Sequence, residues 1–215
     1  MKEKDQIEIA YDFIKSRILS NEYKPAQKLI ESQLSSQIGV SRNTVKLALL
    51  RLEKERLVEI EKNRGAIVKA FTLEEVLNYL EIRIYLECLI IKSAVLNIND
   101  AQLKKMEEII NQMEDCIENN RLDDYSNFNS KFHDIIYQAS TNPQAVELVT
   151  TIKTQLSRYN LRTILIPGRN VNSFKEHHAI FTALKNREVD KAVEAIKLHI
   201  SNVRKTIQDF YQYLV

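Results

Sequence analysis

Glycine is scarce in this sequence of 215 residues, which contains only Gly39, Gly65 and Gly168. A dinucleotide-binding fingerprint or a phosphate-binding loop needs several glycines close together, because the backbone must turn sharply and approach a phosphate group there. The three glycines of this chain lie far apart. The sequence therefore excludes both of these nucleotide-binding motifs.

Cysteine and long apolar segments are also rare. Cys88 and Cys116 lie in helix-like segments without CxxC spacing, which is typical of reduced core cysteines in a cytoplasmic protein. The charged start MKEKDQIEIAYDF lacks the apolar region of a secretory signal. The longest apolar region, residues 81–96, carries charged side chains and falls short of the roughly 18 apolar residues of a membrane span. We therefore expect a cytoplasmic protein with no membrane partner.

The net charge is small, but it is unevenly distributed. Residues 1–70 carry 14 Lys and Arg against 10 Asp and Glu, a net charge of +4, whereas residues 71–215 have a net charge of −2. A modestly basic N-terminal third favours a polyanionic partner for that part of the chain.

The N-terminal third has the pattern of a small α+β domain. Apolar residues at helical spacing predict three short helices, and a Pro-containing turn separates the first two. An alternating pattern that follows, around a tip at residues 63–65, predicts a β-hairpin. The helices are expected over residues 7–20, 29–38 and 42–56.

From residue 72 onward the pattern changes to long helices. Their starts are indicated by capping motifs at Thr72, Asp123, Asn142 and Ser173. We expect helices over about 72–97, 99–120, 123–140 and 142–165, one that starts at 173, and a last one over 190–213. The predicted fold class is mainly α: an N-terminal winged helix-turn-helix with a small β-hairpin (1–70), then a C-terminal all-α antiparallel helical bundle (71–215).

The stretch GVSRNTVK, residues 39–46, predicts a helix-turn-helix. This motif needs a small residue in its first helix and a turn residue that tolerates positive φ, which Ser35 and Gly39 supply. Ser41 then caps the next helix. On that helix a stripe of apolar residues packs against its neighbours, namely Val45, Ala48, Leu49 and Leu52.

The N-terminal end of this second helix is predicted to bind DNA. Arg42 and Lys46 are four residues apart on one face, with Asn43 and Thr44 beside the cap at Ser41. No acidic residue occurs between Glu31 and Glu53, so this helix end suits the phosphate-lined major groove. The alternative is that these cations only form a solvated face.

The predicted hairpin tip has the same character. Lys62 and Arg64 are basic, and Gly65 permits a close approach of the backbone. A basic wing tip beside such a helix can enter the adjacent minor groove, and the alternative is an ordinary charged turn.

These motifs resemble the winged helix-turn-helix of the GntR family of bacterial transcriptional regulators. The matching segments are KLIESQL, GVSRNTVKLALLRL and RLVEIEKNRGAIV, within residues 7–70. The resemblance implies a cytoplasmic DNA-binding regulator that binds double-stranded operator DNA as a homodimer. Lys46 stands where the family often has Arg, and Lys lacks the fork that binds guanine at two points.

Histidine gives the second domain its clearest functional signal. His133, His177 and His199 lie on three different predicted helices, and three inward-pointing imidazoles are a known way to build a metal site in a helical bundle. Spacing alone leaves this open, because a single helical histidine is more often hydrogen-bonded than a ligand.

Residues 72–210 resemble the FCD ligand-binding domain of the FadR subfamily of GntR regulators. The segments NSKFHDIIYQASTNP, EHHAIFTAL and AIKLHI carry the resemblance. It implies a divalent metal, such as Zn, Ni or Mn, on His133, His177 and His199. The fourth ligand of the family, usually Asp, is here Asn129, which lacks the negative charge.

The resemblance also implies a small-molecule effector. Arginines that could hold a carboxylate are Arg83, within EIRIYLE, and further Arg158, Arg162 and Arg169. The alternative for each of them is an ion pair at the surface or between domains. We therefore expect a non-enzymatic regulator, repression being the usual outcome in such families, whose effector is an organic or sugar acid. One alternative is a regulator for which the divalent ion itself is the effector, and a remote alternative is a metal-dependent hydrolase.

Overall fold

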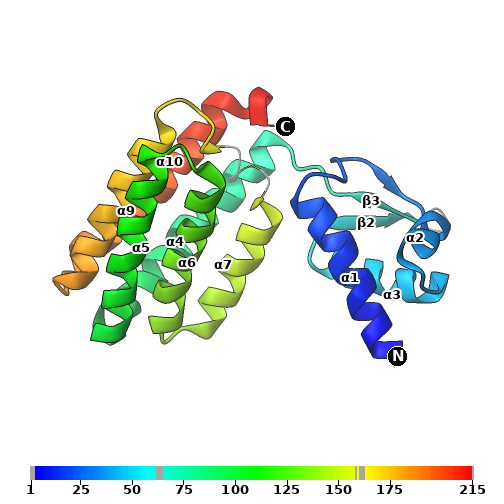
Figure 1. Ribbon diagram of the computed structural model, residues 1–215, viewed down its shortest axis with the longest axis horizontal. Coiled ribbons are helices and arrows are strands. Elements are labelled where there is room, and N and C mark those ends of the chain that lie inside the picture. The colour runs from blue at the N-terminus through cyan, green and yellow to red at the C-terminus, as the bar shows by residue number, and fades with distance from the viewer. Residues whose placement is uncertain (1–2, 62–64, 158, 160–162, 215) are drawn as a thin grey trace. The chain divides into compact units, whose positions relative to one another are not determined.

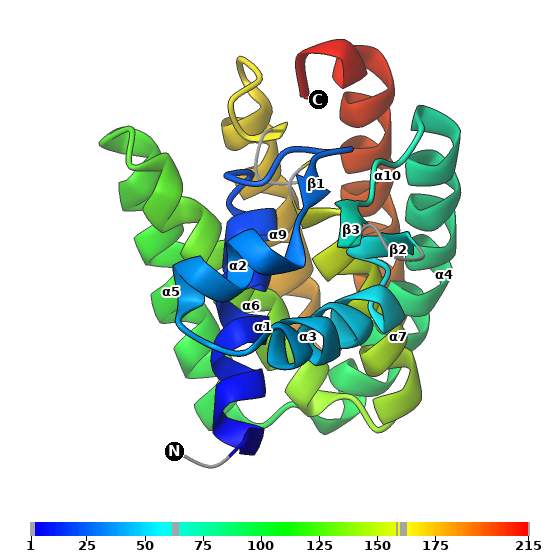
Figure 2. The same ribbon diagram turned by 90° about the vertical axis from the view of Figure 1, so that its right-hand side faces the viewer.

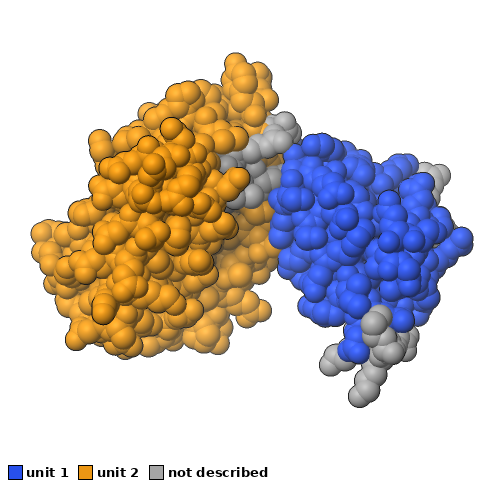
Figure 3. Space-filling view, in the orientation of Figure 1, with its two compact units in different colours: residues 1–72 blue, residues 73–215 orange. Residues whose placement is uncertain are grey.

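The computed structural model describes residues 3–61, 65–157, 159 and 163–214 (Figure 1). The chain divides into two compact units, Met1–Thr72 and Leu73–Val215, which Figure 3 shows in different colours. The sequence predicted a boundary between residues 70 and 71. Each unit has its own hydrophobic core.

The N-terminal unit contains three helices. They are α1 (Glu3–Leu19), α2 (Glu31–Ile38) and α3 (Arg42–Lys54). Ile14 of α1 and Leu49 and Leu52 of α3 are among the largest fully buried side chains, because the helical spacing of the apolar residues places them on inward faces. The helices and the small sheet pack around this core, as both ribbon views show (Figures 1 and 2).

A three-stranded antiparallel sheet completes the unit. The strands are β1 (Lys28–Leu29), β2 (Val58–Glu61) and β3 (Gly65–Val68), in the order β1-β3-β2. The predicted hairpin is confirmed by the pairing of Val58 with Val68 and of Glu61 with Gly65. The sequence missed β1, since we predicted a helix from Leu29, which instead pairs with Ala66.

The C-terminal unit is all-helical, as predicted. Its described helices are α4 (Leu73–Asn97), α5 (Asp100–Glu118), α6 (Leu122–Ala139), α7 (Pro143–Gln155), α9 (Arg169–Lys185) and α10 (Val189–Leu214). Asn99 forms a full capping box with Gln102 at the start of α5, and Asn142 caps α7 ahead of Pro143.

Three predicted helix boundaries are wrong. Asp123 lies in the first turn of α6, where Arg121 holds the capping position. Helix α7 ends at Gln155, ten residues before the predicted 165. Helix α9 begins at Arg169 after Gly168, so Ser173 is a buried residue inside the helix and no cap.

The core of the C-terminal unit lies between helices that run side by side (Figures 1 and 2). It contains large side chains such as Phe132, Met106 and Met113, all fully buried. Over the part of the chain that the structure describes, none of the helices combines the length and the apolar character that a membrane span requires.

The sheet predicts a stability difference between two glycines. A Cβ atom on Gly65 (φ +92°) would lie 2.4 Å from the carbonyl oxygen of Leu29 in β1, whereas one on Gly39 (φ +76°) would meet no atom within 4 Å. Both substitutions by alanine strain the backbone by about 1–2 kcal/mol, but only Gly65→Ala also pushes β1 away from β3. We expect Gly65→Ala to lower the free energy of unfolding clearly more than Gly39→Ala, as measured by urea denaturation. Equal losses would contradict the steric role of Gly65.

Candidate functional site

The turn between α2 and α3 has the geometry that the sequence predicted. Gly39 ends α2 in the left-handed conformation (φ 76°, ψ 32°), and its N–H donates to the carbonyl of Ser35. The Ser35 hydroxyl donates to the carbonyl of Val40 at 2.6 Å, which holds the turn from the other side. Ser41 then caps α3 by accepting from the Thr44 N–H at 3.0 Å. These bonds fix the direction in which α3 leaves the turn.

The exposed end of α3 presents the predicted DNA-binding residues. Arg42, Asn43 and Lys46 are exposed, while the stripe Val45, Ala48, Leu49 and Leu52 is buried. Arg42, Lys46 and Gly65 line one cavity of about 590 Å³, which is hollowed between α2, α3 and the sheet. The wing and the helix end therefore border the same hollow.

Two predictions for this face need qualification. Thr44 is buried at 3% exposure, and its hydroxyl is 2.8 Å from that of Ser41, so its side chain supports the helix cap and does not face outward. Gly65 lies so close to the backbone of Leu29 that a larger residue would not fit. This contact within the protein explains the glycine, and no contact with DNA is needed to explain it. Lys62 and Arg64 lie outside the described residues.

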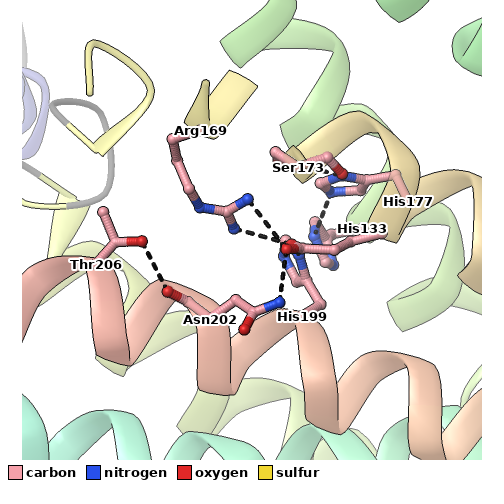
Figure 4. A network of polar contacts seen from close by, with 8 residues as sticks. His133, Arg169, Ser173, His177, His199, Asn202 and Thr206 are labelled. Atoms are coloured by element: carbon pink, nitrogen blue, oxygen red, sulfur yellow. Dashed lines mark hydrogen bonds and ion pairs between the residues drawn. The ribbon is translucent and has the colours of Figure 1, made fainter. Parts of the chain in front are cut away.

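The three predicted histidines meet in the centre of the C-terminal unit. His133 comes from α6, His177 from α9 and His199 from α10, and one ring nitrogen of each lies within 4.8 Å of the others. The two Nε2 atoms of His133 and His177 are 3.3 Å apart. All three side chains are buried, and Figure 4 shows them converging. The tertiary structure thus brings together residues that are far apart in sequence.

Neighbouring oxygen atoms orient two of the imidazoles. His177 Nδ1 lies 2.6 Å from the backbone carbonyl of Ser173, and His199 Nδ1 lies 2.7 Å from a carboxylate oxygen of Glu176. Each Nδ1 must donate its proton to such an acceptor, which leaves the Nε2 lone pair free. This is the arrangement found around metal-ligating histidines.

Burial keeps these imidazoles neutral. It is the main reason why the pKa of each of His133, His177 and His199 lies well below its usual range. The nearby positive charges of Lys153, Arg83 and Arg169 lower these pKa values further. A neutral imidazole can accept a cation without first losing a proton, so the cluster suits a metal ion.

Asn129, the fourth predicted ligand, has a buried oxygen atom that is available to a divalent cation. It lies one helical turn before His133 on α6, and its buried Oδ1 atom has no hydrogen-bond partner among the described residues. A buried carbonyl oxygen without a partner is costly, and a cation would satisfy it. Three imidazole nitrogens and one oxygen form a set that zinc or nickel accepts.

The sequence missed the role of Glu176. Because Glu176 directly precedes His177 on one helix, we expected its side chain to point away from that histidine. In the structure Glu176 contacts His199 on α10. Its two carboxylate oxygens accept from Arg169 at 3.2 and 2.9 Å, and Oε1 also accepts from Asn202 at 2.8 Å. Ser173, which the sequence placed at a helix start, is the residue that orients His177.

Arg83, a predicted effector ligand, belongs to a second buried network. Its Nε donates to Glu87 Oε1 at 3.0 Å, and the Tyr137 hydroxyl donates to the same oxygen at 2.7 Å. The ammonium group of Lys153 lies over the ring of Tyr137. Burial, together with the charge of Arg83, lowers the pKa of Lys153 to about 8. Arg83 is therefore neutralised by Glu87. Arg158 and Arg162 lie outside the described residues.

Comparison with known families gives two matches. Residues 6–68 match the family described as bacterial regulatory proteins, gntR family, and residues 78–202 match the FCD domain. Among similar proteins, the HTH-type transcriptional repressor RspR of Escherichia coli (strain K12) is 25% identical over 87% of this chain and 82% of its own length. The Uxu operon regulator of Haemophilus influenzae is 26% identical over 89% of this chain and 77% of its own length.

Solved structures show the same fold. Escherichia coli McbR/YncC has a TM-score of 0.79 at 21% identity, covering 98% of this chain and 99% of that one. A GntR transcriptional regulator from Rhodococcus sp. RHA1 has a TM-score of 0.74 at 20% identity, covering 95% and 98%. At such identities these likenesses concern the fold alone.

Proposed function

This chain belongs to the GntR family of bacterial regulatory proteins and carries an FCD domain, and from this premise we propose that it is a repressor whose operator binding responds to a small acid bound beside a metal ion. That it is a DNA-binding transcriptional regulator follows from the family. Repression is supported by relatives that are named transcriptional repressors, among them RspR and GlaR of Escherichia coli.

The hydrolase alternative is rejected. The family and the similar proteins are regulators and not enzymes. The carboxylate nearest to the histidines, Glu176, is also held by Arg169, Asn202 and His199, so it is not free to act as a general base.

The turn geometry carries the proposal for DNA binding. Gly39 and Ser41 aim the N-terminal end of α3 outward, and Arg42, Asn43 and Lys46 stand exposed there. A helix end with cations and an amide suits both phosphates and the acceptor-rich edge of guanine in the major groove. Lys62, Arg64 and Gly65 of the wing are proposed to approach the adjacent minor groove.

We expect Arg42→Ala and Lys46→Ala each to weaken binding to an operator that the purified protein selects from random duplexes. Loss of a base contact should weaken the binding free energy by about 1–3 kcal/mol. Loss of a phosphate contact should reduce the slope of log affinity against log salt concentration by about 1. Fluorescence anisotropy at several salt concentrations measures both. Lys54→Ala, at the other exposed end of α3, is the matched control and should bind as the parent does. Unchanged affinity and slope in both variants would contradict the groove assignment.

The proposed metal site is formed by Asn129, His133, His177 and His199. Its support is the convergence of the three histidines, their neutral state and the unpartnered Oδ1 of Asn129. When bound there, a divalent ion would supply positive charge for an effector carboxylate. Because Asn129 contributes no negative charge, the ion should bind more weakly here than at a site with aspartate. Weak binding is reversible, so the alternative that the ion itself is the effector stays open.

Calorimetry with Zn²⁺, Ni²⁺ and Mn²⁺ on chelator-stripped protein tests this site. We expect Asn129→Asp to raise affinity by about 1–2 kcal/mol, since a carboxylate both ligates the ion and offsets its charge. His133→Ala, His177→Ala and His199→Ala should abolish binding. Asn127→Asp, an exposed position on the same helix, is the control and should leave affinity unchanged. Parent-like binding by the histidine variants would refute the site, and an ion that alone changes operator affinity would favour the metal-responsive alternative.

Cationic side chains near the histidines support an acidic effector. Arg83 and Lys153 are close enough to lower the pKa of His133, while Glu87 neutralises only one of these charges. With a divalent ion present, the site would carry excess positive charge in a buried setting, and a carboxylate would balance it. Control of DNA binding then requires that the acid bind one arrangement of the protein better than the other.

Helix α4 supports a homodimer. Four large apolar side chains on it are exposed, Ile82 at 51%, Tyr85 at 72%, Leu89 at 47% and Leu96 at 71%. At 3.6 residues per turn they fall within about 60° of one another, so they form one stripe, here called the α4 stripe. The opposite face of α4 is buried in the bundle, so the α4 stripe is a second, exposed apolar face, which typically marks a protein–protein interface.

A second copy of this chain fits the α4 stripe. In an antiparallel two-fold pairing centred on Leu89, Leu96 lies opposite Ile82 of the partner subunit, because 82 and 96 are equally distant from 89. By the same count Tyr85 lies opposite Ser93 of the partner subunit, about one turn from Leu89 of the partner subunit and from Leu96 of the partner subunit. The pairing also gives the two DNA-binding units the two-fold relation that a palindromic operator requires.

Leu89→Glu tests this interface, because it places two like charges at the centre of the pairing. We expect the parent to sediment as a dimer at micromolar concentration and the variant as a monomer with much weaker operator binding. Leu148→Glu, at a comparably exposed leucine (55%) on α7, is the control and should remain dimeric. A dimeric Leu89→Glu variant, or a parent that binds its operator tightly as a monomer, would contradict the proposal.

A further inference from the structure

A polar cavity lined by Glu176, Arg169 and Asn202 opens between α9 and α10. Its volume is about 380 Å³, within the usual range for small-molecule sites. The polar residues that line it come from α9 and α10 and include Arg169, Asn172, Lys175, Asn202, Lys205 and Thr206. Figure 4 shows Arg169, Asn202 and Thr206 around this space, with His133 and His177 beyond.

Arg169 offers an unused donor edge. Its two terminal nitrogens donate to the two oxygens of Glu176, but its Nε has no hydrogen-bond partner among the described residues. The residue is only 7% exposed. A buried N–H group without an acceptor costs free energy. Because Arg169 lines the cavity, an acceptor that enters it and reaches this N–H group would be bound favourably.

The charges around the cavity favour an anion. Arg169, Lys175 and Lys205 carry positive charge, against the negative charges of Glu176 and Asp209. The Glu176 charge is already shared with His199 and Asn202. A guanidinium group, two exposed ammonium groups and the nearby Asn172 amide match the several acceptor oxygens of a phosphate group.

We propose that this cavity binds the phosphate group of a small metabolite on the Nε edge of Arg169, and that its occupancy is coupled through Glu176 to cation binding at the three histidines. The volume exceeds that of a bare phosphate ion, which favours a phosphorylated metabolite over inorganic phosphate. The anion site stands by itself. The coupling rests on the proposed metal site.

Glu176 provides the physical link. Its Oε2 atom accepts from both Arg169, at 2.9 Å, and His199 Nδ1, at 2.7 Å. A phosphate on Arg169 draws guanidinium charge away from Glu176, so the carboxylate binds the His199 N–H more strongly and makes Nε2 a better donor to a cation. The anion and the cation also attract each other. The coupling is therefore positive, and it must be reciprocal.

The anion site is tested on the chelator-stripped, full-length protein by calorimetry at constant ionic strength. The probes are glycerol 3-phosphate, inorganic phosphate and succinate. We expect glycerol 3-phosphate to bind most tightly and succinate least. Failure of both phosphates to bind at about 10 mM, a concentration that reveals even weak sites, or tighter binding of succinate, would overturn the assignment.

Variants locate the bound phosphate. Arg169→Lys keeps a positive charge but removes the Nε edge, and the surface double variant Lys175→Gln/Lys205→Gln leaves the buried ion pair intact. We expect each to weaken glycerol 3-phosphate binding at least tenfold, whereas Lys197→Gln, an exposed lysine on α10, should have no effect. Parent-like binding by the double variant would refute this site.

The coupling is tested by titrating Ni²⁺ at buffered free-ion concentrations, with and without saturating glycerol 3-phosphate. We expect the phosphate to raise Ni²⁺ affinity at least fivefold, and Glu176→Gln to remove this increase. An unchanged or weakened Ni²⁺ affinity would refute the coupling while leaving the anion site intact. Absence of Ni²⁺ binding under all conditions would refute the metal site and the coupling together.

Discussion

A buried carboxylate must be paired and hydrogen-bonded, and in the C-terminal unit this constraint falls on Glu176. Its partners are Arg169 on the same helix, α9, and His199 and Asn202 on α10. The interactions that neutralise this carboxylate therefore also connect α9 with α10. Removal of one partner from a buried pair typically costs about 3–5 kcal/mol. The orientation of His199, and with it the geometry of the histidine cluster, depends on this network.

The same constraint explains why the cluster remains ready for a ligand. Burial, together with the positive charge of Arg169, lowers the pKa of His199, so this imidazole is oriented by Glu176 and still stays neutral. Around it Arg83 and Lys153 add positive charge that Glu87 only partly offsets. The positive charge of this buried region is consistent with the proposal that an acid binds there beside a cation.

In the N-terminal unit the constraint is a backbone turn. Gly39 adopts a conformation that other residues reach only with strain, and Ser35 and Ser41 satisfy the polar groups on either side of it. Because α3 is fixed at its first residue and packed along its buried stripe, its exposed cations have one defined direction. Local chemistry therefore sets the DNA-binding face.

Much of this could be predicted from the sequence by itself. The mainly helical fold, the hairpin and the turn at Gly39 follow from periodicity, capping residues and turn chemistry, which act over a few residues. Where the sequence misled, packing decided. Leu29 pairs with the distant Ala66, whereas Ser173 and Thr44 are buried and make contacts within their own helix or its cap. The residues of a capping motif can also occur inside a helix, so only packing shows whether such a motif marks the start of a helix.

The histidines show the division most clearly. Their spacing on three helices, together with the family resemblance, was enough to predict a shared site, but spacing carried no information on which ring nitrogen faces inward or on what neutralises the surroundings. Only the tertiary structure placed Glu176 against His199, and Lys153 near His133. The sequence determines which side chains are available and which helix face they occupy. The tertiary structure decides their electrostatics, because desolvation and charge pairing depend on neighbours that lie far away along the chain.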